Sequence, residues 1–149
     1  MLGGAAAIVG ITVFGVMAWR AVTVDEVTVT NAGHRLSAIR EAFGDTPALV
    51  TYDPSGGLIR RETTPPASPD PVSHIYVVTY RAADGRFLRA DVPFWFFKLK
   101  APAAQFLVRD TGLDLNALGL TAGDLEREGP TLILDERDEG GGRMLVWTE

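Results

Sequence analysis

Side chains that commonly carry out catalysis are scarce in this chain of 149 residues. It has no cysteine and two histidines, His34 and His74, which excludes a cysteine nucleophile and a thiolate metal site and argues against zinc. Ser73 precedes His74, but neighbours in sequence are not a nucleophile and base on facing elements, and no G-x-S-x-G motif is present. The sequence therefore predicts no nucleophilic triad, no metal site and no cofactor.

Carboxylates offer the remaining catalytic chemistry, because paired acids can serve a glycosidase or a metal hydrolase. Acids cluster in two places, at Asp124, Glu126 and Glu128 and then at Asp135, Glu136, Asp138 and Glu139. The second cluster departs from a calcium loop, because Arg137 stands where an oxygen ligand is needed. We expect both clusters to be solvated surface and keep a carboxylate-dependent hydrolase as the third functional hypothesis.

Residues 94–100 combine four consecutive aromatic side chains with two lysines. Aromatic rings can lie at the acyl boundary of a bilayer while ammonium groups meet lipid phosphates, and an apolar patch can equally receive a protein partner. The candidates for such a membrane or partner contact are Phe94, Trp95, Phe97, Lys98 and Lys100. The alternative is that these rings form the core of the domain.

The run from Met1 to Trp19 contains no charged side chain and no proline. As a helix it would be about 28 Å long, close to the roughly 30 Å hydrocarbon core of a bilayer. Trp19 and Arg20 suit the headgroup boundary. A buried core helix would show a polar stripe, and a cleaved signal peptide would show a basic start and a small-x-small cleavage site. We therefore predict a single-pass signal anchor over residues 1–20, in contact with membrane lipid.

The orientation of this anchor is predicted from the arginines that follow it. Arg20, Arg35 and Arg40 come within about 20 residues after the run, the range in which flanking charges set topology. No lysine or arginine precedes the run. The positive-inside rule then places the following domain in the cytoplasm, and a segment upstream of Met1 would alter this prediction.

Residues 21–149 are long enough for one hydrophobic core and predict a single α+β domain of mostly antiparallel strands with two or three short helices. We expect hairpins of residues 48–52 with 58–62, 74–81 with 86–92, and 131–134 with 144–148, and further strands near 22–29 and 105–108. We expect helices from the N-cap Asn31 to Phe43, after Pro93, and from the capping box at Thr121 to Gly129. Residues 63–73 are a proline-rich loop within the domain.

In the hairpin of residues 74–92 we expect one dry face. Leu88, Ala90 and Val92 share that face, whereas Phe87, Arg89 and Asp91 share the other. A sheet of this kind has one face on the core and one in water.

The charge distribution bears on the partners of the domain. The net charge of −5 argues against binding to nucleic acid. Residues 20–100 carry 10 cations and 9 acids, whereas residues 101–149 carry 4 cations and 10 acids. We expect the near-neutral, aromatic part to face the membrane and the acidic part to face water.

These features predict a non-catalytic, single-pass membrane-anchored domain that acts as an accessory, regulatory or interaction subunit of a membrane system. Its expected partner is a protein in the membrane. The layout, an anchor followed by a small α+β domain, is typical of small bacterial membrane proteins. The second hypothesis is an anchored lipid- or small-ligand-sensing domain that uses residues 94–100 as its binding surface.

Overall fold

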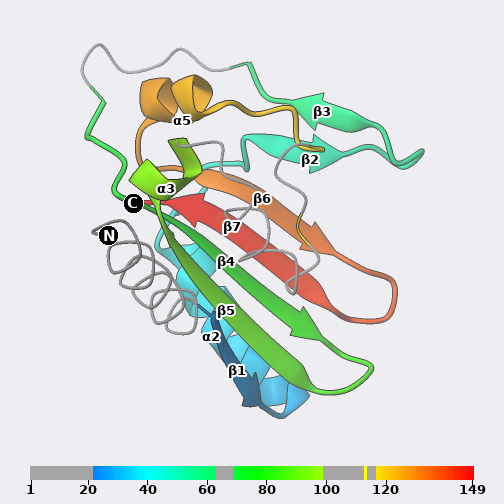
Figure 1. The fold of residues 1–149 in the computed structure, drawn as a ribbon. Coiled ribbons are helices and arrows are strands. Elements are labelled where there is room, and N and C mark those ends of the chain that lie inside the picture. The colour runs from blue at the N-terminus through cyan, green and yellow to red at the C-terminus, as the bar shows by residue number, and fades with distance from the viewer. Residues whose placement is uncertain (1–21, 63–68, 99–112, 114–116) are drawn as a thin grey trace, which may run out of the picture.

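The computed structural model describes residues 22–62, 69–98, 113 and 117–149. Its centre is a seven-stranded sheet with the strand order β1-β5-β4-β7-β6-β2-β3 (Figure 1). The strands are β1 (Val22–Glu26), β2 (Val50–Tyr52), β3 (Leu58–Arg60), β4 (His74–Arg81), β5 (Arg86–Pro93), β6 (Leu132–Arg137) and β7 (Arg143–Thr148). The helices in these residues are α2 (Val29–Glu41), α3 (Phe94–Lys98) and α5 (Ala122–Glu128). The predicted α+β class is confirmed for this part of the chain.

The three predicted hairpins are present. The strand β4 pairs with β5, β6 with β7, and β2 with β3, each in antiparallel register. The turn between β4 and β5 contains Gly85 at φ 66°, and the turn between β6 and β7 contains Gly141 at φ 84°. Both are left-handed conformations that cost glycine little, so the turn residues identify these hairpins from local sequence.

The assembly of the hairpins into one sheet depends on distant residues. The strand β1 pairs with β5 and β7 pairs with β4, both antiparallel. By contrast, β2 lies parallel to β6 and meets it at the single register position Val50↔Leu134. The hairpin of residues 50–60, here called the arm, therefore joins the sheet only at its base and diverges from β6 beyond it (Figure 1).

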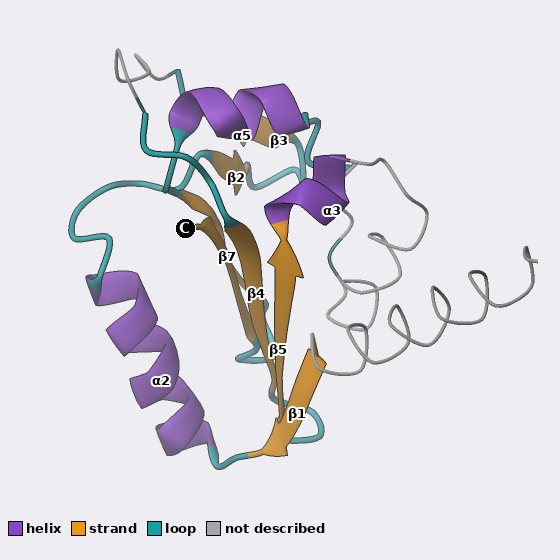
Figure 2. Ribbon diagram, turned by 60° about the vertical axis from the view of Figure 1, so that its left-hand side comes forward, coloured by secondary structure: helices purple, strands orange, loops and turns teal. Residues whose placement is uncertain are grey.

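Apolar side chains cover both faces of the central strands. The helix α2 packs across one face (Figure 2), where it contributes Ala32 and Leu36 to a core cluster with Val78, Leu145 and Trp147. Phe87 and Tyr80 are also buried in this cluster. The expectation of one dry face in the hairpin of residues 74–92 holds at Arg89, which is exposed, and is wrong at Phe87, which is buried in the cluster with α2.

The opposite face carries a second core cluster. Its members include Val50, Ile75, Val77, Ala90, Val92, Ile133, Leu134 and Val146 from the sheet, Leu49 directly before β2, and Phe94, Phe96 and Leu125 from the two short helices. The helices α3 and α5 lie together at one end of the sheet (Figures 1 and 2). The cluster thus continues from the sheet into the helices that close this end.

The helix α2 begins earlier than its sequence suggests. Its N-cap is Thr28, which has an extended backbone (φ −70°, ψ 154°) and whose hydroxyl accepts a hydrogen bond from the Asn31 N–H at 3.4 Å. The prediction of Asn31 as the N-cap is therefore wrong. Threonine and asparagine are both good N-caps, and it is Thr28 that has the extended backbone of an N-cap here.

No helix in the described ranges is long and apolar enough to cross a membrane. The predicted anchor, residues 1–20 with Trp19 and Arg20, lies outside the described residues, as do the predicted strand 105–108 and residues 63–68 of the proline-rich loop.

Candidate functional site

The aromatic helix α3 follows directly from strand β5. The strand ends at Pro93, and the Phe94 N–H then donates a hydrogen bond to the Ser73 carbonyl at 2.8 Å. Phe94 and Phe96 are buried, with 3% and 6% of their surface exposed. Both belong to the second core cluster, so these two rings fix the helix to the end of the sheet.

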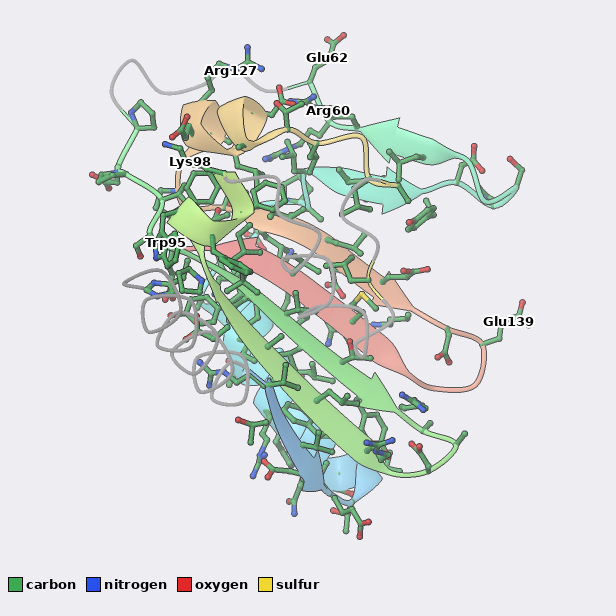
Figure 3. The ribbon with its side chains drawn as sticks, viewed as in Figure 1. Arg60, Glu62, Trp95, Lys98, Arg127 and Glu139 are labelled. Carbon is green, nitrogen blue, oxygen red and sulfur yellow. The ribbon has the colours of Figure 1, made fainter. Side chains whose placement is uncertain are left out.

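Trp95, between these two phenylalanines, is 50% exposed. Phe97 is partly buried against the core cluster. Lys98 is exposed on the same helix (Figure 3), and Lys100 lies outside the described residues. The predicted contact residues therefore divide between core and surface: Phe94 belongs to the core alternative, whereas Trp95 and Lys98 remain available to a membrane or a partner.

Lys98 connects α3 to α5. Its Nζ donates to Glu126 Oε1 at 2.6 Å and lies 6.0 Å from the centre of the Phe94 ring. Glu126 comes from the acidic part of the sequence, which was expected to lie apart from the aromatic part. The two parts are not segregated in this region, because α3 and α5 are in contact through this ion pair.

Asp124 is the third residue of α5, and its side chain is hydrogen-bonded to the residue that caps the helix. It forms a capping box with Thr121: Asp124 Oδ2 accepts from the Thr121 N–H at 2.9 Å and from the Thr121 hydroxyl at 2.7 Å, and the Asp124 N–H donates to Thr121 Oγ1 at 3.2 Å. The backbone and hydroxyl of Thr121, followed by Arg60, lower the pKa of Asp124 to about 2, although burial opposes the shift. The carboxylate is ionised at neutral pH and unsuited to act as a general acid.

Two arginines approach the other oxygen of Asp124. Arg60 Nη2 lies 3.3 Å from Asp124 Oδ1, and the Arg127 guanidinium donates to the same oxygen. Arg60 stands at the end of β3 and Arg127 in the last turn of α5 (Figure 3). This carboxylate therefore ties the base of the arm to α5, which is a structural task.

The acids of the second cluster lie in the second half of β6 and in the turn that follows it, away from the acids of α5. Asp135 accepts two hydrogen bonds from Arg143, both 2.8 Å, and Asp138 accepts from the Gly142 N–H at 2.8 Å. The strand β6, about 20 Å long at its ordinary rise, separates the start of the β6–β7 turn from α5. The structure thus does not bring these acids into one cleft, and no cluster of three potential metal-ligating side chains occurs among the described residues.

A serine, a histidine and an aspartate do meet at the start of β4. Ser73 Oγ lies 3.1 Å from His74 Nδ1, and His74 Nε2 lies 3.9 Å from Asp91 Oδ1. The Ser73 hydroxyl, however, donates to the Glu149 carbonyl at 2.8 Å. Its proton is directed away from the histidine, so His74 is not placed to act as its base. Sequence reasoning missed this contact with Asp91, which depends on the β4–β5 register.

The arm displays apolar side chains to solvent. Tyr52, Leu58 and Ile59 are 41%, 38% and 52% exposed. Leu58 lies opposite Tyr52 in the hairpin, and Ile59 lies opposite Thr51. The sequence identified the hairpin but not its exposure, because exposure follows from its attachment to β6 at one position.

The comparisons with known proteins add no relative to this description. The sequence matches no protein-family model, and neither the curated proteins nor the solved structures include a chain similar to it.

Proposed function

We propose that this chain is a non-catalytic, single-pass membrane-anchored domain that serves as an accessory or interaction subunit of a membrane system. The observation that carries the proposal is the position of β1. This strand begins at Val22, two residues after Arg20 closes the uncharged run of residues 1–19. A sheet joined to an anchor without a linker would be held at the membrane surface.

The strand β1 is a full member of the sheet. All five of its residues, from Val22 to Glu26, pair with residues of β5. A force or tilt applied at the anchor would therefore be transmitted to the sheet through a ladder of backbone hydrogen bonds. Such a mounting favours a domain that works at a fixed height and orientation above the bilayer.

The exposed arm supports an interaction role. Leu58 and Ile59 present apolar surface at one edge of the sheet, and exposed apolar residues on an edge strand are typical of sites that receive another chain. Val24, 47% exposed, lies on β1 at the opposite edge. A substitution at Val24 therefore serves as a control for a substitution of an exposed apolar residue on the arm.

Membrane anchoring is tested by extraction. The full chain with a C-terminal tag should remain with membranes in alkaline carbonate and dissolve in detergent. Ile11→Arg, at the middle of the uncharged run, should release part of the chain, because an arginine at the centre of a span costs about 3 kcal/mol on insertion scales. Thr12→Ser is the control. A full chain that is folded and soluble without detergent would overturn the proposal.

The interaction role is tested by purification from native membranes in mild detergent, followed by mass spectrometry. A companion protein in stoichiometric amount should accompany the full chain. Ile59→Lys should reduce the amount of this companion, whereas Val24→Lys should leave it unchanged; lysine is well tolerated on edge strands. Recovery of the chain alone, with its anchor intact, would argue against an accessory subunit.

A further inference from the structure

We infer that α3 is a second contact of this domain with the bilayer, in which the Trp95 side chain lies in the membrane interface. This inference rests on the proposed anchoring of residues 1–20. It assigns an occupant, the lipid interface, to an exposed aromatic side chain that contributes little to the core of the domain.

The direction of β1 carries the first step. The strands β1 and β5 are antiparallel, with Val22 opposite Ala90 and Glu26 opposite Arg86. The chain therefore enters the sheet at the end of β5 from which α3 follows. An anchor joined to Val22 and the helix that carries Trp95 consequently lie at the same end of this strand pair.

The second step compares how far α3 and Arg20 extend beyond the paired residues Val22 and Ala90. From Ala90, opposite Val22, the strand β5 continues for three residues to Pro93, or about 10 Å, and α3 begins there. Arg20 is two residues before Val22, so the covalent chain allows it at most about 7 Å from that residue. These lengths are similar, so the helix α3 reaches the level at which the anchor would enter the lipid headgroups.

The third step is the way in which α3 presents Trp95. Its sequence neighbours Phe94 and Phe96 are both buried. The Trp95 ring packs edge-on against the Phe96 ring, with the ring centres 5.6 Å apart. The helix is thus held rigidly by the core while the indole remains half exposed. Tryptophan favours the membrane interface, because its ring is apolar and its N–H can still meet water or headgroups.

The charges around α3 indicate the kind of lipid contact. Lys98 is paired with Glu126, and Arg60 and Arg127 are paired with Asp124. Glu128 is a third acid on α5, so these three cations and three acids sum to zero and leave little net field to attract anionic lipid. The contact should therefore be made by the indole, occur on zwitterionic lipid, and depend weakly on salt.

Continuity of the chain favours lipid over a protein as the occupant. The residues before β1 form an uncharged run of 19 residues, and this run would bring a bilayer, not another protein, to the end of the sheet that carries Trp95. A second copy of the chain or a different protein remains an outcome that the experiment can reveal.

The experiment uses the full chain in phosphatidylcholine nanodiscs. Because the chain has no cysteine, single cysteines can carry an environment-sensitive fluorophore at Trp95→Cys, at Val13→Cys within the run, and at Glu139→Cys in the exposed β6–β7 turn (Figure 3). Lys98→Cys is a second reporter on α3, and a thermal melt checks that each variant is folded. Lipids with a quencher near the headgroup report contact with the interface, and lipids with a quencher on the acyl chain report depth.

The expected result is strong acyl-chain quenching at position 13, strong headgroup-level quenching at positions 95 and 98, and little quenching at position 139. Quenching at 13 without quenching at 95 and 98 would overturn the inference and leave the proposed anchor intact. Absence of quenching at 13 would overturn both. A blue-shifted emission at 95 that lipid quenchers do not reduce would show that a second copy covers Trp95, and would also overturn the inference.

Discussion

The helices α3 and α5 lie at the same end of the sheet but are held there by different interactions. α3 is fixed by two buried phenylalanines. α5 buries Leu125 as well, but its start is fixed by the hydrogen bonds of Thr121 and Asp124 and by two arginines. Apolar burial changes little with pH and with moderate salt, whereas a charged cap responds to both. We therefore expect changes of pH and salt to destabilise the packing of α5 more than that of α3.

The largest expected effect separates Phe94 from its neighbour Trp95. Phe94→Ala should destabilise the domain by about 3–5 kcal/mol, because it removes a ring that is 3% exposed and leaves a cavity. Trp95→Ala, in the same helix, should cost less, about 1 kcal/mol, because half of the indole is already in solvent and one edge-on contact with Phe96 is lost. Thermal and denaturant unfolding of the full chain in mild detergent measures both. Equal losses would mean that Trp95 belongs to the core and that the lipid contact is wrongly assigned.

Phe94 and Trp95 also show what the sequence alone did not predict. The helix after Pro93 was predicted correctly, but the pattern did not decide which aromatic side chains face the core. Phe94 and Phe96 are two residues apart, which places them on nearly opposite sides of a helix. Both can be buried only where packed residues enclose the helix on more than one side, and a five-residue helix has too little periodicity to reveal this.

The same limit applies to the sheet and the polar contacts. The hairpin of residues 74–92 was predictable, because strand alternation and the Asp84-Gly85 turn are local signals. The parallel contact of Val50 with Leu134 joins residues far apart in the chain, as does the pairing of Arg60 with Asp124. No local signal specifies these contacts. The capping box at Thr121 was predictable from its spacing, but the arginines that complete it were not.

The next largest effect should come from the charge of Asp124. Its folded-state pKa of about 2 lies below the ordinary value of 3.8, so its ionised form stabilises the folded state. This stabilisation is fully present above about pH 5 and is lost as the pH falls toward 2. Asp124→Asn should therefore cost about 2 kcal/mol at pH 7, the range for hydrogen bonds to a charged group.

The pH series provides the control for this prediction. The difference in unfolding free energy between the wild type and Asp124→Asn should shrink steadily between pH 5 and pH 2, roughly the interval that the two pKa values define. The effect of Phe94→Ala should change little over the same interval. A constant difference for Asp124→Asn would show that its carboxylate does not titrate below its ordinary range when folded.

The hydroxyl of Thr121 should have a smaller effect. It accepts from the Asp124 N–H and donates to the Asp124 carboxylate, and loss of an N-cap side chain typically costs about 1 kcal/mol. Thr121→Ala should show this loss in denaturant unfolding, whereas Thr121→Ser should retain most of the stability because it keeps the hydroxyl. Equal losses in the two variants would assign the effect to the methyl group and not to the cap.

The smallest effect should come from the ion pair that connects the two helices. Lys98 and Glu126 are 51% and 47% exposed, and pairs exposed to this degree contribute about 0.2–1 kcal/mol in water. Lys98→Met keeps the aliphatic length of the side chain and removes its charge, so it isolates the electrostatic part. A double-mutant cycle with Glu126→Gln, measured in low and high salt, should give a coupling energy that salt reduces. A coupling that exceeded the cost of Thr121→Ala, or that salt left unchanged, would mean that α3 depends on charge as α5 does. The contrast between the two helices would then fail, because apolar burial would not be the only interaction that holds α3. The position of the exposed Trp95 would then depend on pH and salt as well.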